Sequence, residues 1–275
     1  MMIPFVKMHG LGNDFVILDQ RNNPHAFDSQ AIRKISDRRF GIGCDQLITL
    51  EVSNQNQADI FMKIYNADGN EVGACGNATR CVAFLLKEED GKAHHTIQTK
   101  AGFLSAEALN DTQVTVDLGA PHFQWQDIPL SQEMDTLHMP ITFEGLKDPA
   151  TLSVGNPHLI FFVYDVESID LVHAGENLTH HPFFPEGTNV EIVEKVDDHT
   201  LRMRVYERGV GITHACGTGA AASVVAAKKR GIIQTPAKVI LEGGELMVDY
   251  QQTVKITGQV TLSFRGSLNP HIFRT

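Results

Sequence analysis

The stretch HACGTGAAASVV, residues 214–225, decides the fold, because a cysteine and two glycines stand directly before a run of small apolar residues. A second stretch, GACGNATRCVAF at residues 73–84, has the same arrangement. Each continues as a helical pattern, and the second-half helix carries a small or apolar residue on every face until Lys228. A helix that is apolar all round is normally buried on all sides. A sheet curled around each helix would provide that burial.

The two stretches belong to an internal repeat. The copies at residues 64–84 and 205–226 both begin with an apolar residue and a tyrosine, and each tyrosine lies ten residues before the motif cysteine. Further pairs match upstream: LGNDFVIL (11–18) with VGNPHLIF (154–161), and GIGCDQLITL (41–50) with PEGTNVEIVE (185–194). Their common order and spacing predict two homologous, pseudo-symmetric halves.

Secondary-structure patterns agree with a duplicated α+β fold. Short runs of β-branched and aromatic residues, separated by turns, recur through both halves. We expect each half to be a mixed β-sheet or barrel wrapped around a central helix. Residues 1–119 should form the N-terminal half with Cys75, and residues 120–261 the C-terminal half with Cys216. Helical patterns are few: residues 29–38, 77–88, 168–175 and 217–230.

The composition excludes several classes of function. A net charge of −10 argues against nucleic acid or an anionic membrane surface as a partner. The chain has no apolar run of about 18 residues and no secretory signal pattern, so we expect a cytoplasmic protein. The four cysteines are too few for a disulfide framework and form no CxxC pair, which favours reduced thiols and no metal site. They are Cys44, Cys75, Cys81 and Cys216.

The position of the two motif cysteines suggests acid–base chemistry. The free N–H groups and the dipole of a helix start stabilise a thiolate, which should lower the pKa of a cysteine placed there. Two such thiols at matching positions suit the inversion of a stereocentre, in which one group removes a proton from one face and another returns one to the opposite face. We therefore predict that Cys75 and Cys216 form this pair. For Cys44 and Cys81, a buried packing role is favoured.

Other polar residues near the second motif are candidates for substrate contact. Arg208 could bind a carboxylate and Glu207 an ammonium group, although the pair could equally be an exposed ion pair. His158, in a Gly-Asn-Pro-His turn, is either a structural hydrogen-bonding residue or part of the site. Arg80, at the start of the first apolar helix, must find a partner or reach solvent. No GxG pattern has the spacing of a dinucleotide site.

A redox-sensing dithiol protein is the main alternative from another class. It would explain two facing thiols through a Cys75–Cys216 disulfide, without any substrate. It would not explain the polar residues at repeat-matched positions: Asn13, Asn156, Glu207 and Arg208.

Six motifs, in order and over essentially the whole chain, resemble those of the diaminopimelate epimerase family. They are KMHGLGNDFVILD, GIGCDQ, YNADGNEVGACGNATRC, GNPH, PEGTNVE and ERGVG…ACGTGA. The resemblance implies the interconversion of LL- and meso-diaminopimelate without a cofactor, in lysine and peptidoglycan precursor biosynthesis. It also implies that the C-terminal segment, about residues 262–275, returns to the first half. A homodimer is a further expectation.

Matched motif by motif, the resemblance implies roles for individual residues. Cys75 and Cys216 are the acid–base pair, and His158 and Glu207 tune the thiols. The implied substrate contacts are Asn13, Gln46, Asn66, Gly76, Asn77, Asn156, Asn189, Glu207, Arg208, Gly217 and Thr218.

Related families share part of these motifs, and this chain departs from the family's commoner sequence at a few positions. Proline and hydroxyproline racemases resemble the same fold and cysteine pair, but they tend to have a histidine where Asn77 stands. The phenazine-biosynthesis relatives lack the thiol pair. The chain departs from the family's commoner pattern at ACGNATRC, at Cys44 and at Ile212, and none of these departures removes a proposed contact.

Overall fold

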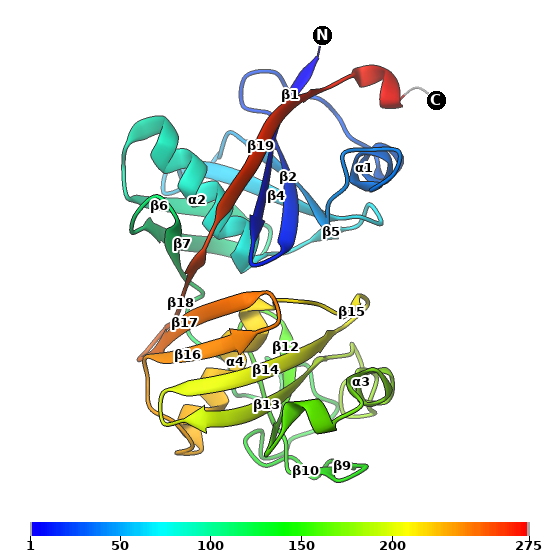
Figure 1. Ribbon diagram of the computed structural model, residues 1–275, viewed down its shortest axis with the longest axis vertical. Coiled ribbons are helices and arrows are strands. Elements are labelled where there is room, and N and C mark those ends of the chain that lie inside the picture. The colour runs from blue at the N-terminus through cyan, green and yellow to red at the C-terminus, as the bar shows by residue number, and fades with distance from the viewer. Residues whose placement is uncertain (1, 274–275) are drawn as a thin grey trace. The chain divides into compact units, whose positions relative to one another are not determined.

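The structure is a computed structural model that describes residues 2–273 (Figure 1). Residues 1, 274 and 275 lie outside the described part, and with them the end of the segment 262–275. The chain divides into two compact units: Met1–Val116 together with Gly258–Thr275, and Asp117–Thr257. The second unit is therefore continuous in sequence, whereas the first is built from both ends of the chain.

The first unit is a mixed sheet with two α-helices. Strand β2 pairs with β1 antiparallel and with β3 parallel, and β4 pairs antiparallel with β3 and β5 and parallel with β6. Strand β7 closes a hairpin with β6, and β19 pairs antiparallel with β1. The elements are β1 (Ile3–Gly10), β2 (Asn13–Asp19), α1 (Ser29–Ser36), β3 (Gln46–Glu51), β4 (Ile60–Asn66), β5 (Glu71–Val72), α2 (Gly76–Asp90), β6 (His94–Thr99), β7 (Gly102–Ala108), β19 (Thr261–Leu268) and the 3-10 helix η2 (Pro270–Phe273).

In the second unit, strands β11 to β17 repeat the pairing order of β1 to β7. Strand β12 pairs with β11 antiparallel and with β13 parallel, and β14 pairs antiparallel with β13 and β15 and parallel with β16. Strand β17 again forms a hairpin with the strand before it. The elements are β9 (Thr142–Phe143), β10 (Leu146–Lys147), β11 (Ala150–Ser153), β12 (Pro157–Val163), the 3-10 helix η1 (Val166–Ser168), α3 (Leu171–Leu178), β13 (Asn189–Asp197), β14 (Thr200–Glu207), β15 (Gly211–Ile212), α4 (Gly217–Lys229), β16 (Ala237–Leu241) and β17 (Gly244–Tyr250).

Two further strands contain the points at which the chain passes between the units. They are β8 (Gln113–Asp117) and β18 (Val254–Gln259). The identical order of parallel and antiparallel pairings in both units confirms the internal duplication that the repeated motifs predict.

The two central helices differ in how completely they are buried. Helix α4 contacts six strands of its own unit, and its residues from Gly219 to Ala227 are all buried, as expected for a helix of small residues. Helix α2 packs on β1, β6 and β7, and its last turn, Glu88 to Asp90, is exposed. Gly91 ends this helix in the left-handed conformation (φ 76°), which glycine adopts without strain.

Helix α3 begins later than the sequence pattern predicts. The pattern places its start at residue 168, but residues 166–168 form the separate turn η1. The Asp170 side chain accepts a hydrogen bond from the His173 N–H and caps α3, so the α-helical residues begin at Leu171.

Candidate active site

Each candidate cysteine immediately precedes a central helix. Cys75 is the N-cap of α2 and Cys216 the N-cap of α4, both with extended backbones (φ −151° and −115°). The following glycines, Gly76 and Gly217, are the first helical residues and are buried. The predicted equivalence of the two thiols therefore holds within the duplicated units.

Asn13, the first residue of β2, connects the first thiol to helix α2 and to the loop before β3. Its Oδ1 lies 3.9 Å from the Cys75 sulfur and accepts a 3.1 Å hydrogen bond from Asn77 Nδ2. Its Nδ2 donates to Asp45 at 3.0 Å. Because both ends of the amide are engaged, its orientation is fixed, with the carbonyl oxygen toward the thiol. Three residues that the motifs implicate thus come together at the start of α2.

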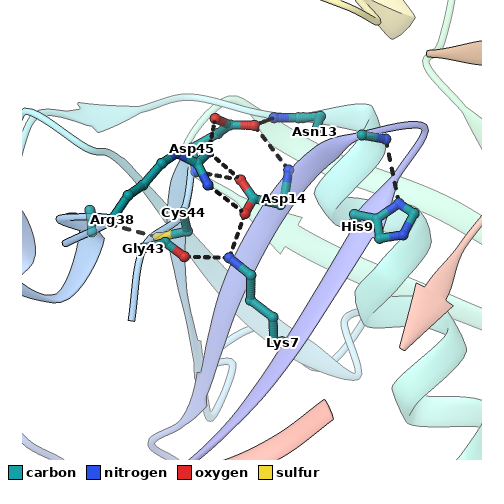
Figure 2. Close-up of polar contacts among 10 residues, drawn as sticks. Lys7, His9, Asn13, Asp14, Arg38, Gly43, Cys44 and Asp45 are labelled. Atoms are coloured by element: carbon teal, nitrogen blue, oxygen red, sulfur yellow. Dashed lines mark hydrogen bonds and ion pairs between the residues drawn. The ribbon is translucent and has the colours of Figure 1, made fainter. Parts of the chain in front are cut away.

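Asp45, which accepts the hydrogen bond from Asn13, belongs to a cluster of two cations and two carboxylates (Figure 2). Arg38 binds Asp14 at 2.8 Å and Asp45 at 2.7 Å, and Lys7 also binds Asp14. Burial alone would raise the pKa of Asp14, but the hydrogen bonds from Arg38 and Lys7 outweigh it and hold that pKa well below its usual range. Asp14 therefore stays ionised at neutral pH, and its ion pair with Arg38 anchors the loop that carries Asp45.

Gln46 and Asn66 form a second amide pair in this unit. They are register partners at the start of β3 and the end of β4, and Gln46 Nε2 donates to Asn66 Oδ1 at 2.9 Å. Gln46 directly follows Asp45, the residue that holds Asn13. Cys44, on the other side of Asp45, packs in the core with its sulfur 3.5 Å from Ser36 Oγ, and burial raises the pKa of this thiol.

In the second unit, His158 is the centre of a buried polar group. Its Nδ1 lies 2.6 Å from Glu191 Oε1, and its Nε2 lies 3.1 Å from Asn156 Oδ1. Asn189 Nδ2 lies 3.5 Å from His158 Nδ1, and Asn189 Oδ1 accepts a 2.9 Å hydrogen bond from the backbone N–H of Arg208. His158 is fully buried, and its hydrogen bonds link it to Asn156 and Asn189, two of the residues that the motifs implicate.

Glu207 and Arg208 do not bond to each other. Glu207 accepts a hydrogen bond from Thr213 Oγ1 and is also hydrogen-bonded to Cys216, and burial raises the pKa of its carboxyl. The guanidinium of Arg208 instead donates to the backbone oxygens of Glu186 (2.6 Å) and Gly187 (3.2 Å). Glu207 therefore belongs to the surroundings of the second thiol, whereas Arg208 is held by the loop before β13.

The expected lowering of the pKa by a helix start does not occur at Cys216. Burial raises the pKa of this thiol well above its ordinary value, and the negative charges of Glu207 and Glu191 raise it further. Hydrogen bonds from Thr218, at 3.5 Å, and from the Gly219 N–H, at 3.4 Å, act in the opposite direction but are outweighed. The prediction was wrong because it considered only the helix start, and neither the burial of the thiol nor the two carboxylates beside it.

The described residues contain neither a metal-binding cluster nor a membrane-spanning helix. Between residues 2 and 273, no group of three or more histidines, cysteines, aspartates or glutamates could hold a metal ion. No helix in the same part of the chain is long and apolar enough to cross a membrane.

Comparison with known proteins identifies the family. Residues 5–124 and 150–262 match the family model described as diaminopimelate epimerase. The chain belongs to the diaminopimelate epimerase family. The diaminopimelate epimerases of Rhodospirillum centenum and Rhizorhabdus wittichii are 45% and 46% identical to it, over 96% and 99% of this chain and 92% and 98% of theirs. The resemblance of the six motifs and the predicted enzyme class, an isomerase, are confirmed.

Solved structures outside the diaminopimelate epimerases share the fold. A PhzF-family phenazine biosynthesis protein from Bacillus anthracis superposes with a TM-score of 0.71 at 17% identity, over 98% of this chain and 99% of that one. A probable proline racemase from Agrobacterium radiobacter gives 0.71 at 15% identity, over 98% and 95%. At such low identity the likeness shows the fold alone, and it confirms the predicted α+β class.

A buried cation in the first unit of this diaminopimelate epimerase family member bonds to Asn77, one of the residues that the motifs implicate. Arg80 is fully buried, and its Nη2 donates to Asn77 Oδ1 at 2.9 Å. Its Nε and Nη1 are buried and have no hydrogen-bond partner among residues 2–273. Burial lowers the pKa of this guanidinium. Gly10 leaves room for it, because a Cβ there would lie 3.1 Å from Arg80 Nη2.

The sequence analysis did not anticipate a buried carboxyl group next to His158 in the second unit. Glu191 lies on β13 two residues after Asn189 and is fully buried against His158. Its position in the motif PEGTNVE reads as one more strand residue with no chemical signal. The available indication is that it lies within a run of apolar strand residues, Val190, Ile192 and Val193, which predicts a strand buried on both faces, where an unpaired carboxylate is rare.

Proposed function

We propose that this chain interconverts LL-2,6-diaminopimelate and meso-diaminopimelate by exchanging the proton on one α-carbon. The observation that carries the proposal is the pair of cysteines, each capping the central helix of one of two topologically identical units. The curated relatives at about 45% identity bear the name of this activity. The substrate is a small amino acid, and the reaction belongs to lysine and peptidoglycan precursor biosynthesis.

The mechanism we infer uses one thiol as base and the other as acid. In one direction the Cys75 sulfur takes the α-proton and Cys216, whose surroundings favour the protonated form, delivers a proton to the opposite face. In the reverse direction the roles exchange, so the chemistry needs no further acid, and we propose that no cofactor takes part. His158 and Glu207 adjust the protonation of the second thiol.

The remaining polar residues would bind the two zwitterionic ends of the substrate. Backbone N–H groups at the starts of α2 and α4 suit carboxylates, as helix N-termini do generally. They belong to Gly76, Asn77, Gly217 and Thr218. The side-chain amides supply both donors and acceptors for ammonium and carboxylate groups. They belong to Asn13, Gln46, Asn66, Asn156 and Asn189, with Glu207 and Arg208 as the charged contacts.

The test is proton NMR of the purified chain with LL-diaminopimelate in D2O, with a thiol reductant and without added cofactor or metal. Deuterium at one α-carbon, appearing as meso product accumulates, is the expected result. Cys75→Ala and Cys216→Ala variants should fold and lose this exchange. Full activity in either variant would refute the two-thiol mechanism, and no exchange in the folded, reduced parent would refute the proposed substrate.

Two alternatives make different predictions in the same assay. A proline or hydroxyproline racemase would exchange the α-proton of those amino acids instead, but this chain has Asn77 where those enzymes tend to have histidine. A redox-sensing dithiol protein would exchange neither substrate. A cytoplasmic location and a homodimer stay predictions.

A further inference from the structure

Among residues 2–273, Glu191 is the buried carboxyl near the second thiol that has no role in the proposed function. Its Oε1 lies 2.6 Å from His158 Nδ1, and both side chains are fully buried. Its Oε2 is also buried and has no hydrogen-bond partner among residues 2–273. An ionised carboxylate in such a place is costly unless it shares a proton or a charge with a neighbour. The hydrogen bond from His158 Nδ1–H supplies such a neighbour and lets the carboxylate keep its negative charge.

The same carboxyl reaches the helix start that carries Cys216. A Cβ built on Gly219 would lie 2.8 Å from Glu191 Oε1 and 3.4 Å from the Cys216 sulfur. The carboxyl oxygen and the sulfur therefore lie on either side of the position that a Cβ of residue 219 would occupy, and this position is empty because residue 219 is a glycine. No side-chain atom of residue 219 separates the two groups, so their charges interact at short range in a dry interior.

The other charged or titratable groups around Glu191 come from three elements. His158 lies on β12, Glu207 ends β14, and Cys216 caps α4. Of these, Glu207 already contacts the thiol through a hydrogen bond. Glu191 differs from it because it is sealed from solvent and bonded to the histidine.

We propose that Glu191 is a positioning residue of this site: it fixes His158 through Nδ1 and, by its negative charge next to Gly219, holds Cys216 as the protonated thiol. The proposal deepens the proposed function, because a thiol held in this form is the acid of that mechanism. The bond to Glu191 also leaves His158 Nε2 directed at Asn156, one of the implied substrate contacts.

The test measures the thiol directly and uses no substrate. In a Cys75→Ala background, the rate of Cys216 alkylation by iodoacetamide is followed at one mildly alkaline pH by mass spectrometry of the Cys216 peptide. Only the thiolate reacts, so the rate reports the ionised fraction. Glu191→Gln should raise this rate about tenfold, because removal of a nearby negative charge lowers the pKa of a thiol by about one unit. Glu191→Asp, which retains the charge, should stay close to the parent.

Glu194→Gln is the matched control. Glu194 lies on the same strand, but it pairs with Arg202 at 3.4 Å. This variant should alkylate at the parent rate. Circular dichroism checks that every variant is folded. An unchanged rate in folded Glu191→Gln, or an equal increase in Glu191→Asp and Glu191→Gln, would overturn the charge role.

A second variant keeps the proposal testable if Glu191→Gln does not fold. Gly219→Ala places a methyl group where the carboxyl oxygen now approaches, so it should displace Glu191 and speed alkylation of Cys216. An unchanged rate in the folded variant refutes the proposal. Failure of the proposed function looks different: the parent chain would show no deuterium exchange with diaminopimelate, whatever the alkylation rates.

Discussion

Replacement of Arg80 by methionine should lower the activity of the protein and raise its stability. Methionine has nearly the length of arginine and keeps the site filled, but it removes a buried cation with two nitrogen atoms that have no partner among residues 2–273. It also removes the hydrogen bond to Asn77 Oδ1, and with it the support for the amide that holds Asn13 beside Cys75.

The magnitudes follow from these contacts. A hydrogen bond from a charged donor contributes about 1.5–3 kcal/mol, so the loss of Asn77 orientation should lower kcat/KM by about tenfold to a hundredfold. Removing a poorly paired buried charge is often stabilising, and we expect the free energy of unfolding to rise by about 1–2 kcal/mol. Activity is measured by deuterium exchange with LL-diaminopimelate and stability by urea denaturation.

The control is Arg265→Met in the same unit. Arg265 forms an exposed ion pair with Glu88 at 2.7 Å, and such pairs contribute only about 0–1 kcal/mol. This variant should change neither quantity by much. Full kcat/KM in a folded Arg80→Met chain would show that the guanidinium does not position Asn77, and the support inferred for Asn13 would be wrong.

Three further predictions concern the first unit. Gly10→Ala should lower activity and cost about 1–3 kcal/mol of stability in urea denaturation, because its Cβ would lie only 3.1 Å from Arg80 Nη2. A fully active variant would contradict this prediction. Cys44→Ala should leave deuterium exchange intact and lower the free energy of unfolding by about 1 kcal/mol, because this thiol packs in the core. Loss of exchange in the folded variant would instead assign Cys44 a role in the site. Asp14 has a folded-state pKa below its ordinary 3.8, so its contribution to folding stability is present above pH 3.8 and is lost as the pH falls below it. Chemical denaturation from pH 6 to about 3 should therefore show a smaller loss of stability in Asp14→Asn than in the parent. Equal losses would count against the cluster of Lys7, Asp14, Arg38 and Asp45.

The position of residues that repeat between the halves could be predicted from the sequence, because the same motif occurs once in each half. Cys75 and Cys216 share spacing and helix context, so their placement as N-caps followed from pattern alone. Small side chains along α4 likewise predicted its burial on all faces. Local capping decided finer details, such as the start of α3 after Asp170, and these depend on one side chain rather than on periodicity.

Electrostatic partners could not be found in this way, because they are distant in sequence and occur on one half only. Glu191 meets His158 across 33 residues, and the contact exists because β12 and β13 run parallel in a particular register. The raised pKa of Cys216 depends on the burial of the thiol and on the charges of Glu207 and Glu191, which the sequence does not place beside it. A sequence pattern shows which helix precedes which strand, but not which carboxyl lies beneath a helix start.

The return of the chain through β19 has a consequence for how the protein is made. Strand β1 pairs with β2 on one side and with β19 on the other, and β19 lies at residues 261–268. While the ribosome is still adding these last residues, β1 presents a bare edge that could pair with another chain. The unit made of residues 117–257 can finish folding earlier, because all of its strands emerge together. The N-terminal portion, although synthesised first, is the last to become complete.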